Sequence, residues 1–413
     1  MRSLFVFIYI SVSFSFVRAE EVPHCLSNTS LPAFYACVIE NHPKIQATRM
    51  SIEAATMVRD KIIQLPNPSL SLNSIQGKNG GENEGNTSLE VSVNLNESLF
   101  KRSSLGKLGK AEEKIIVAEA QEIIFQIQFQ VIKNFYRYRQ LLDELDLVME
   151  AIDTFKKIEN QFKTRKARGP EQSVTLNLVE LAQGDYALRK NHLNMEKSGI
   201  ETEFKGIFGN DFNFKKEWLP PLKANWPEMR VADLSKNNLE LMKLEAEKDK
   251  VEAEKSIATI ESWPQVSVGP SIERNTFGIN QYIAYGFNLT VDLPILSTNS
   301  AGRSFASKNS LRIQKLYEYS VKKARLENQL LLQKYSSAAE ALKKSISIEV
   351  LKKKHNEIDN LFRQGLAPGS AVIEVHRQIS EFRQSQHEHE IEALEALMSL
   401  NFLSGKEVEE VLK

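Results

Sequence analysis

The chain has 413 residues, of which 42% are hydrophobic and 26% are charged. This length allows more than one domain, and the hydrophobic content is too high for a disordered protein. The 53 basic and 53 acidic residues balance, so no basic excess indicates nucleic acid as a partner. The composition therefore predicts a folded protein that does not bind nucleic acid, and it indicates no particular charged ligand.

The first residues are typical of an export signal. Arg2 precedes the apolar run 4–17, and residues 17–19 resemble a cleavage site formed by small residues. We expect residues 1–19 to be a signal peptide. The residues before Cys25 are not a small apolar lipobox, so we expect no lipid anchor there. No later run approaches the 18 apolar residues of a membrane-spanning helix.

Cys25 and Cys37 are the only two cysteines of the chain. In an oxidising compartment they can close a short loop through a disulfide. Cys37 also fits a small apolar position on a helix, and the sequence does not decide between these alternatives.

Helical periodicity and turn residues divide the rest of the chain into two units. The first unit, 20–209, is expected to contain strands at about 69–76 and 88–95 and a helical hairpin at about 102–208. A linker rich in Trp and Pro follows at 210–229. The second unit, 230–405, repeats the order with strands at about 265–272 and 282–291 and a hairpin at about 303–404, and residues 406–413 form a tail.

The second helical hairpin has an unusually long first arm. No Gly or Pro lies between Gly302 and Gly365, and such a run is far longer than an ordinary globular helix. At 1.5 Å per residue, one continuous helix here is about 90 Å long. The polar segments 77–85 and 273–281 are expected to be loops between the strands of each unit.

The two units are related by a nearly constant offset. Gly169 corresponds to Gly365, and Gly209 corresponds to Gly405, both at 196 residues. The Pro66 that ends the first helical region corresponds to Pro264 at 198 residues. This agreement predicts a tandem duplication of one unit.

The second strand of each unit alternates between apolar and polar residues. This pattern is typical of a half-buried sheet in a soluble protein and of a strand with lipid on one side and water on the other. The strand lengths and the long helices beyond them favour the membrane. Four strands leave open edges, which lipid does not tolerate, so we expect copies of the chain to complete a barrel. The residues expected to face lipid are Leu89, Val91, Val93, Tyr285, Phe287, Leu289 and Val291.

Several motifs resemble the TolC-type outer-membrane efflux family, over about residues 31–405. Leu99-Phe100 and Pro294-Ile295-Leu296 are similar to its strand-to-helix joins. The turn at Gly365-Leu366 and the residues after it are similar to its second periplasmic tip. The resemblance implies a mainly α fold with a small membrane β part: a trimer with a twelve-stranded β-barrel and an α-helical barrel in the periplasm.

The same resemblance implies a function and partners. Members of the family are passive exit ducts in the outer membrane, which receive substrate from a periplasmic adaptor protein and an inner-membrane pump, most often of the RND type. The Pro66-Asn67-Pro68 step is similar to the branch that exports heavy-metal cations (CzcC- and CusC-like), although 97–102 lacks that branch's Gly-Gly-Lys-Arg. Drug efflux and type I secretion remain alternatives, as does a soluble periplasmic coiled-coil protein.

The resemblance also suggests site residues at the periplasmic end. Glu374 lies where the family often has an acid that lines the narrow end, and three copies would form a carboxylate ring; a plain solvated glutamate is the alternative. The tips expected to dock the adaptor contain Gly169, Ser173, Val174, Gly365 and Leu366. We expect both glycines to adopt the left-handed conformation that reverses a helix.

No catalytic, cofactor or metal site is predicted, and the chain is not expected to be an enzyme. The segment His387–Glu390 contains two histidines, but they lie two residues apart and without the HExxH spacing. We interpret this segment as a solvated polar helix face.

Overall fold

The computed structural model describes residues 30–412 apart from 80, 165–168, 224, 230–237, 405 and 407. The expected signal peptide at 1–19, Cys25 and Gly405 lie outside these residues. Cys37 is disulfide-bonded, which decides against the alternative of a free apolar cysteine at this position.

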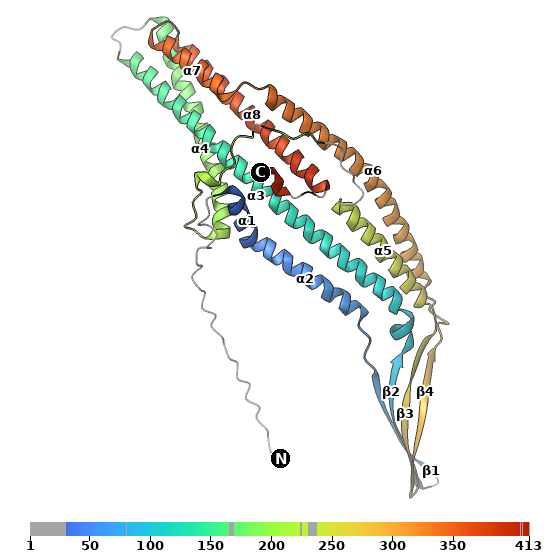
Figure 1. Ribbon diagram of the computed structural model, residues 1–413. Helices are drawn as coiled ribbons and strands as arrows, with labels where there is room; N and C mark the ends of the chain where they lie inside the picture. Colours follow the sequence, from blue (N-terminus) through green and yellow to red (C-terminus); the bar gives the residue numbers. More distant parts are fainter. Residues whose placement is uncertain are drawn as a thin grey trace, which may run out of the picture.

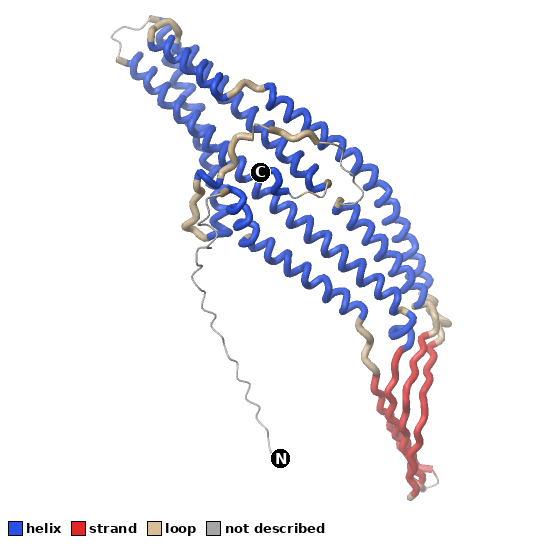
Figure 2. Tube along the Cα trace, viewed as in Figure 1, coloured by secondary structure: helices blue, strands red, loops and turns tan. Residues whose placement is uncertain are grey.

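The described residues form an elongated, mostly helical molecule with one four-stranded sheet at one end (Figures 1 and 2). The first unit contains α1 (Leu31–Asn41), α2 (Pro43–Ile63), β1 (Ser69–Asn79), β2 (Glu82–Asn94), α3 (Arg102–Lys163) and α4 (Pro170–Phe208). The second unit contains α5 (Leu239–Ile260), β3 (Gln265–Phe277), β4 (Asn280–Asp292), α6 (Ser300–Lys344), α7 (Ile348–Arg363) and α8 (Gly369–Leu403). Short helical turns lie at Asn96–Phe100, Lys216–Trp218 and Val408–Leu412.

The strands pair antiparallel in the order β1-β2-β3-β4. Each hairpin is longer than predicted, and most of the expected loops 77–85 and 273–281 is strand. Backbone hydrogen bonds need no apolar side chain, so the Gly- and Asn-rich ends continue the register as far as Asn79↔Glu82 and Phe277↔Asn280. The loop prediction was therefore wrong, because alternation in the sequence ends before the pairing does.

The central pairing of β2 with β3 is interrupted at one point without a change of register. Glu90 pairs with Ser271 and Val93 pairs with Val268, whereas Gly269 and Pro270 have no partners on β2. Pro270 has no N–H to donate to a ladder. A Cβ on Gly269 would lie 1.6 Å from the carbonyl oxygen of Val91, so only glycine fits this close approach of the two strands.

The long helices lie side by side in a curved layer above the sheet (Figure 1). In the half nearer the sheet, α2 contacts α3, α3 contacts α5, and α5 contacts α6. In the other half α3 is flanked by α4 and α8, and α8 contacts α6 and α7. The helix α3 therefore runs through the middle of the layer, while α2, α4 and α6 lie toward its edges.

An aromatic core lies where α1 and the segment after α4 cover α3 and α4. The Phe34 ring stacks on Trp218 with centroids 4.3 Å apart, and it also lies 5.2 Å from Phe135. All three side chains are buried, and each such ring contributes roughly 2–3 kcal/mol by leaving water. Trp218 belongs to the expected linker 210–229, so this segment is part of the core.

Two regions expected to be helical are broken in the structure: the one that ends at Pro66 and the arm from Gly302 to Gly365. The first breaks at His42–Pro43, where His42 Nδ1 accepts a hydrogen bond from the Lys44 N–H at 3.2 Å. The expected continuous arm from Gly302 to Gly365 breaks at 345–347. There the Ser347 hydroxyl accepts from the Val350 N–H at 3.4 Å and caps a new helix. A stretch without Gly or Pro is therefore not always one continuous helix, because a serine can cap the start of a second helix within it.

Candidate functional site

The sheet has one apolar face that is open to the surroundings. A cross-strand row joins Leu72 to Leu89, Leu89 to Ile272, and Ile272 to Tyr285. Tyr285 is 78% exposed, and the next apolar residue along β4, Phe287, is 85% exposed. A soluble protein rarely leaves such a band of large apolar side chains uncovered. This face therefore needs a cover that the single chain does not supply among its described residues.

The residues predicted to face lipid lie on this face, but they are only part of it. Leu89, Val91, Leu289 and Val291 are exposed, and Val93 is half-buried. The sequence prediction missed Leu70 and Leu72 of β1 and Ile272 of β3, which are also exposed. Alternation in Ser69-Leu70-Ser71-Leu72 was the signal that could have identified β1.

The opposite face of the sheet is polar. Its central row contains Ser71, Glu90, Ser271 and Gly286. Asn288 of β4 donates a hydrogen bond to Glu90 of β2 across the intervening β3, and Asn86 donates to Asn275 at 3.0 Å. A sheet with one apolar and one hydrogen-bonded polar face suits an apolar environment on one side and water on the other.

The end of the molecule opposite the sheet contains the two helical turns (Figure 1). After α7, Gly365 adopts φ +75°. Its N–H donates to the Phe362 carbonyl, and the Leu366 N–H donates to the Leu361 carbonyl, both at 2.9 Å. These two bonds form a Schellman motif, so the left-handed conformation predicted for Gly365 is present.

The first turn is built differently. Gly169 precedes α4 with φ −74°, so the left-handed conformation predicted for it is wrong. Residues 165–168, between α3 and α4, lie outside the described part of the chain. Gly369, at the start of α8, packs against the other turn, because a Cβ there would lie 2.8 Å from the Thr175 methyl group. The two turns are therefore neighbours.

The residues predicted to dock an adaptor lie at the surface of these turns. Leu366 is 72% exposed and Val174 is 58% exposed, and Ser173 is also exposed. Two exposed apolar side chains on adjacent turns can be covered by another protein.

Glu374 lies on α8 near this end, and its side chain is half exposed. Arg377 donates hydrogen bonds to both of its oxygens, at 2.7 and 2.9 Å, and Gln378 donates at 2.8 Å. The Arg377 hydrogen bonds, followed by that of Gln378, lower the pKa of Glu374. The carboxylate is therefore ionised at neutral pH, and Arg377 offsets its charge within the chain.

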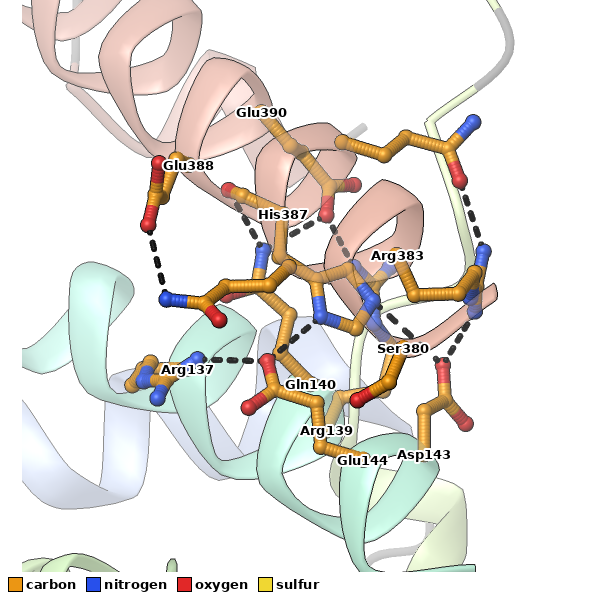
Figure 3. Close-up of polar contacts among 12 residues, drawn as sticks. Arg137, Arg139, Gln140, Asp143, Glu144, Ser380, Arg383, His387, Glu388 and Glu390 are labelled. Atoms are coloured by element: carbon orange, nitrogen blue, oxygen red, sulfur yellow. Dashed lines mark hydrogen bonds and ion pairs between the residues drawn. The ribbon is translucent and has the colours of Figure 1, made fainter. Parts of the chain in front are cut away.

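A buried polar network joins α8 to α3 in the middle of the molecule (Figure 3). Gln140 donates to the Glu390 carboxylate at 2.8 Å, and Arg139 forms an ion pair with the same carboxylate. His387 and Glu390 are only 1% and 2% exposed. The prediction of a solvated helix face was wrong for these two residues, because α8 packs this face directly on α3.

The second part of this network surrounds Glu144. His387 Nδ1 lies 2.7 Å from Glu144 Oε1, and Arg137 donates to the same oxygen at 2.9 Å. Burial alone would raise the pKa of Glu144, but the hydrogen bonds and charges of His387 and Arg137 together lower it. The carboxylate is therefore held in its ionised form, and it ties the two helices together.

The sequence predicted no metal site, yet the fold brings possible ligands together. Among the described residues, ligand atoms of His355, Asp359 and His376 all lie within 4.8 Å of one another. Burial and the neighbouring His355 lower the pKa of His376 to about 4, so its imidazole is neutral at pH 7. The two histidines come from different helices, which explains why sequence spacing did not reveal the group.

One described helix meets the length and composition expected of a membrane-crossing helix. An 18-residue stretch of α3 passes this test with 28% of its residues buried. Because α3 packs against α2, α4 and α5, we assign this stretch to the curved layer of long helices.

No protein-family model and no curated protein matches the chain by sequence. Solved structures of outer-membrane channels, however, have the same fold. The outer-membrane channel OprN superimposes with a TM-score of 0.73 at 13% identity, over 93% of this chain and 91% of that one. A membrane protein from Pseudomonas aeruginosa gives 0.72 at 15% identity, over 95% and 100%. CusC, described by its transmembrane channel formation, gives 0.63 at 14% identity, over 93% and 92%.

These similarities confirm the predicted resemblance at the level of the fold. The chain has the TolC-like arrangement of long helices and a small antiparallel sheet, and it spans nearly the full length of these channels. CusC is one of several comparable structures, so the fold does not favour the heavy-metal branch over the others.

Proposed function

We propose that the chain is a passive exit duct of a tripartite efflux system in an outer membrane. Three copies would combine their four-stranded sheets into a twelve-stranded barrel, with lipid against the Leu72–Tyr285 row and water against the Glu90 row. The main support for this proposal is the sheet, which has one apolar and one polar face. Its edge strands β1 and β4 each pair on one side only within the described residues. Lipid tolerates a sheet only when its edges are closed.

The helices support assembly between copies. The edge helix α4 has exposed apolar residues at every seventh position, namely Val174, Leu181, Leu188 and Met195. On α6 the exposed Phe305, Tyr319 and Leu326 lie at multiples of the same interval, with Arg312 at the position between the first two. Apolar stripes with a seven-residue repeat are typical of helices that pack along their length against other helices. We infer that neighbouring copies cover these edges and close the curved layer into a hollow cylinder.

The end with the two turns is the proposed contact with partners. Its exposed Leu366 and Val174 suit the apolar side chains of a periplasmic adaptor, which in turn would contact an inner-membrane pump, most often of the RND type in this fold. Gly169, Ser173 and Gly365 shape the same surface. Glu374 is the proposed gate residue, although its ion pair with Arg377 means that three copies would present three acid–base pairs instead of three free carboxylates.

The cargo is the least constrained part of the proposal. The Pro66-Asn67-Pro68 step favours heavy-metal cations, and the alternatives are drug efflux and type I secretion with the same fold. A deletion strain distinguishes them. Sensitivity confined to zinc, cobalt, cadmium, copper and silver would support metal efflux, whereas sensitivity to dyes, detergents and antibiotics would overturn it in favour of a multidrug duct.

The membrane assignment is tested by a matched pair of charge insertions on β4. Phe287→Lys places a charge on the apolar face, where lipid disfavours it by roughly 2–4 kcal/mol. Asn288→Lys places the same charge on the polar face. We expect the first variant to lose heat-resistant trimers from the outer-membrane fraction, and the second variant to retain them.

Channel activity is then measured on the purified chain in planar lipid bilayers. The proposal predicts single-channel conductance for the wild type and for Asn288→Lys, with the latter altered in ion selectivity. A mature wild-type chain that fractionates as a soluble monomer would overturn the proposal in favour of a periplasmic coiled-coil protein.

A further inference from the structure

Two buried histidines face each other between α7 and α8. The Nε2 atoms of His355 and His376 are 3.2 Å apart, and their rings are nearly perpendicular at 80°. His355 is 8% exposed and His376 is 6% exposed. Asp359 follows His355 by four residues, so both lie on the same face of α7.

The distance between the two nitrogens suits a shared metal ion. Zinc binds imidazole nitrogen at about 2.0–2.1 Å in tetrahedral geometry, which places two such nitrogens roughly 3.3 Å apart. Both Nε2 atoms therefore lie at the spacing of one tetrahedral edge without any movement of the helices. A carboxylate oxygen of Asp359 lies within 4.8 Å of a ring nitrogen of each histidine, so this residue is placed to supply a third ligand.

We propose that His355, His376 and Asp359 form a binding site for a divalent transition-metal ion such as Zn²⁺. Two imidazoles and one carboxylate are ligands that zinc, cobalt and nickel prefer, and a water molecule would complete four-coordination. The inference does not rest on the proposed duct function, because it concerns an ion bound within one chain.

The surroundings of His355 fit this assignment. Its other ring nitrogen, Nδ1, lies 3.7 Å from a carboxylate oxygen of Glu150 on α3. A carboxylate on that side favours the tautomer with the proton on Nδ1, which leaves the lone pair of Nε2 for a metal. Glu150 and His355 also line a cavity of about 470 Å³. Of the three proposed ligands, His355 lines this cavity, whose wall also includes Asp143 and Asp146 as well as the basic Lys352 and Arg383.

The site would fasten α7 to its neighbours. This helix lies between the break at 345–347 and the turn at Gly365, and its only extensive neighbour among the described long helices is α8. One ion bound by both helices would cross-link them close to the turn that contains Leu366. We therefore expect metal to protect α7 against local opening.

The test uses the full mature chain, purified without a polyhistidine tag and stripped with a chelator. Titration with Zn²⁺ by calorimetry, and with Co²⁺ by visible absorption, should show one ion bound per chain with a tetrahedral cobalt spectrum. His355→Gln and His376→Gln should each weaken binding at least tenfold, and Asp359→Asn should weaken it less. His389→Gln is the matched control, because His389 lies on α8 at the surface.

A second measurement keeps the proposal testable if a histidine variant folds poorly. Hydrogen exchange of the wild type with and without Zn²⁺ should show slower exchange in α7 and around His376, and no change in the sheet. A wild-type chain that binds no metal would leave the pair as an ordinary hydrogen bond between imidazoles and overturn the proposal. Binding of equal strength in all four variants would place the ion elsewhere and overturn it as well.

Discussion

The two helical hairpins follow the same order of elements before them, yet they differ in continuity. In the first hairpin α3 runs for 62 residues without a break, whereas the second hairpin divides the same stretch into α6, with 45 residues, and α7, with 16 residues. By the 196-residue offset, the break at 345–347 corresponds to 149–151 of α3. There Ala151 is fully buried in the middle of the layer.

Position in the layer explains this difference. The helix α3 has neighbouring helices on both sides in both halves of the layer, so packing stabilises it. The helix α6 lies at an edge and has many exposed apolar residues. In the second hairpin, a serine that caps a new helix is therefore sufficient to interrupt the long helix. The two hairpins therefore share their order of elements, and burial decides which long helix stays continuous.

The prediction with the largest expected effect compares the substitution of Phe by Ala in the two hairpins, at a buried and at an exposed position. Phe135 of α3 is completely buried, whereas Phe305 of α6 is 70% exposed. Phe135→Ala should lower the free energy of unfolding by about 4 kcal/mol because it leaves a cavity in the aromatic core. Phe305→Ala should change it by less than about 0.5 kcal/mol within a chain.

Denaturant unfolding of the detergent-solubilised chain, followed by circular dichroism at fixed protein concentration, measures both variants. The Phe305 variant should instead reduce the fraction of assembled oligomer, because that side chain lies on a proposed contact between copies. Equal destabilisation by the two variants would contradict the assignment of α3 to the centre and α6 to the edge.

The next effect concerns the connection between the hairpins. Glu390 of α8 is buried against Arg139 and Gln140 of α3, while Glu388 of the same helix is exposed. Glu390→Gln leaves the Arg139 charge without its partner, which should lower the free energy of unfolding by about 3 kcal/mol. Glu388→Gln is the control and should be nearly neutral. If both variants unfold at the same denaturant concentration, the network does not hold the hairpins together.

Much of this arrangement could be predicted from the sequence, because its signals are local and repeated. The glycines at the ends of the repeats indicate the number and lengths of the hairpins. Alternation from Tyr285 to Val291 is sufficient to identify the exposed apolar face of β4. Neither prediction needs knowledge of distant contacts.

The predictions that failed depend on which distant residues meet. The pairing of Asn79 with Glu82 shows no apolar pattern, because backbone bonds alone extend the hairpin. His387 looked solvated because its partner Glu144 lies 243 residues away. His355 and His376 come together only when α7 folds back along α8. Polar groups of this kind are placed by tertiary packing, which periodicity does not report.

A smaller effect distinguishes the two turns. Gly365 has φ +75°, whereas the corresponding Gly169 has φ −74°. Gly365→Ala forces a side chain into the left-handed region and should lower stability by about 1–2 kcal/mol. Gly169→Ala meets no such strain and should change stability by less than about 0.5 kcal/mol. Hydrogen exchange in α7 and at the start of α4 measures each effect locally. An equal loss of stability in the two variants would contradict the difference in backbone conformation between the two glycines.

The smallest effect concerns pH and the contact between Glu144 of the first hairpin and His387 of the second. The pKa of Glu144 is lower in the folded chain than in the unfolded chain, despite its burial, because His387 and Arg137 stabilise the carboxylate. Its contribution to stability is therefore complete above the unfolded pKa of about 4.5 and is lost as pH falls through the lower folded value. Thermal unfolding between pH 7 and pH 3 should show this loss, and Glu144→Gln should flatten that part of the profile. Asp146→Asn, at a residue of α3 outside this contact, should leave the profile unchanged. A Glu144→Gln chain that keeps the full wild-type slope would mean that other carboxylates control the acid response, and the two hairpins would then be joined chiefly through Glu390.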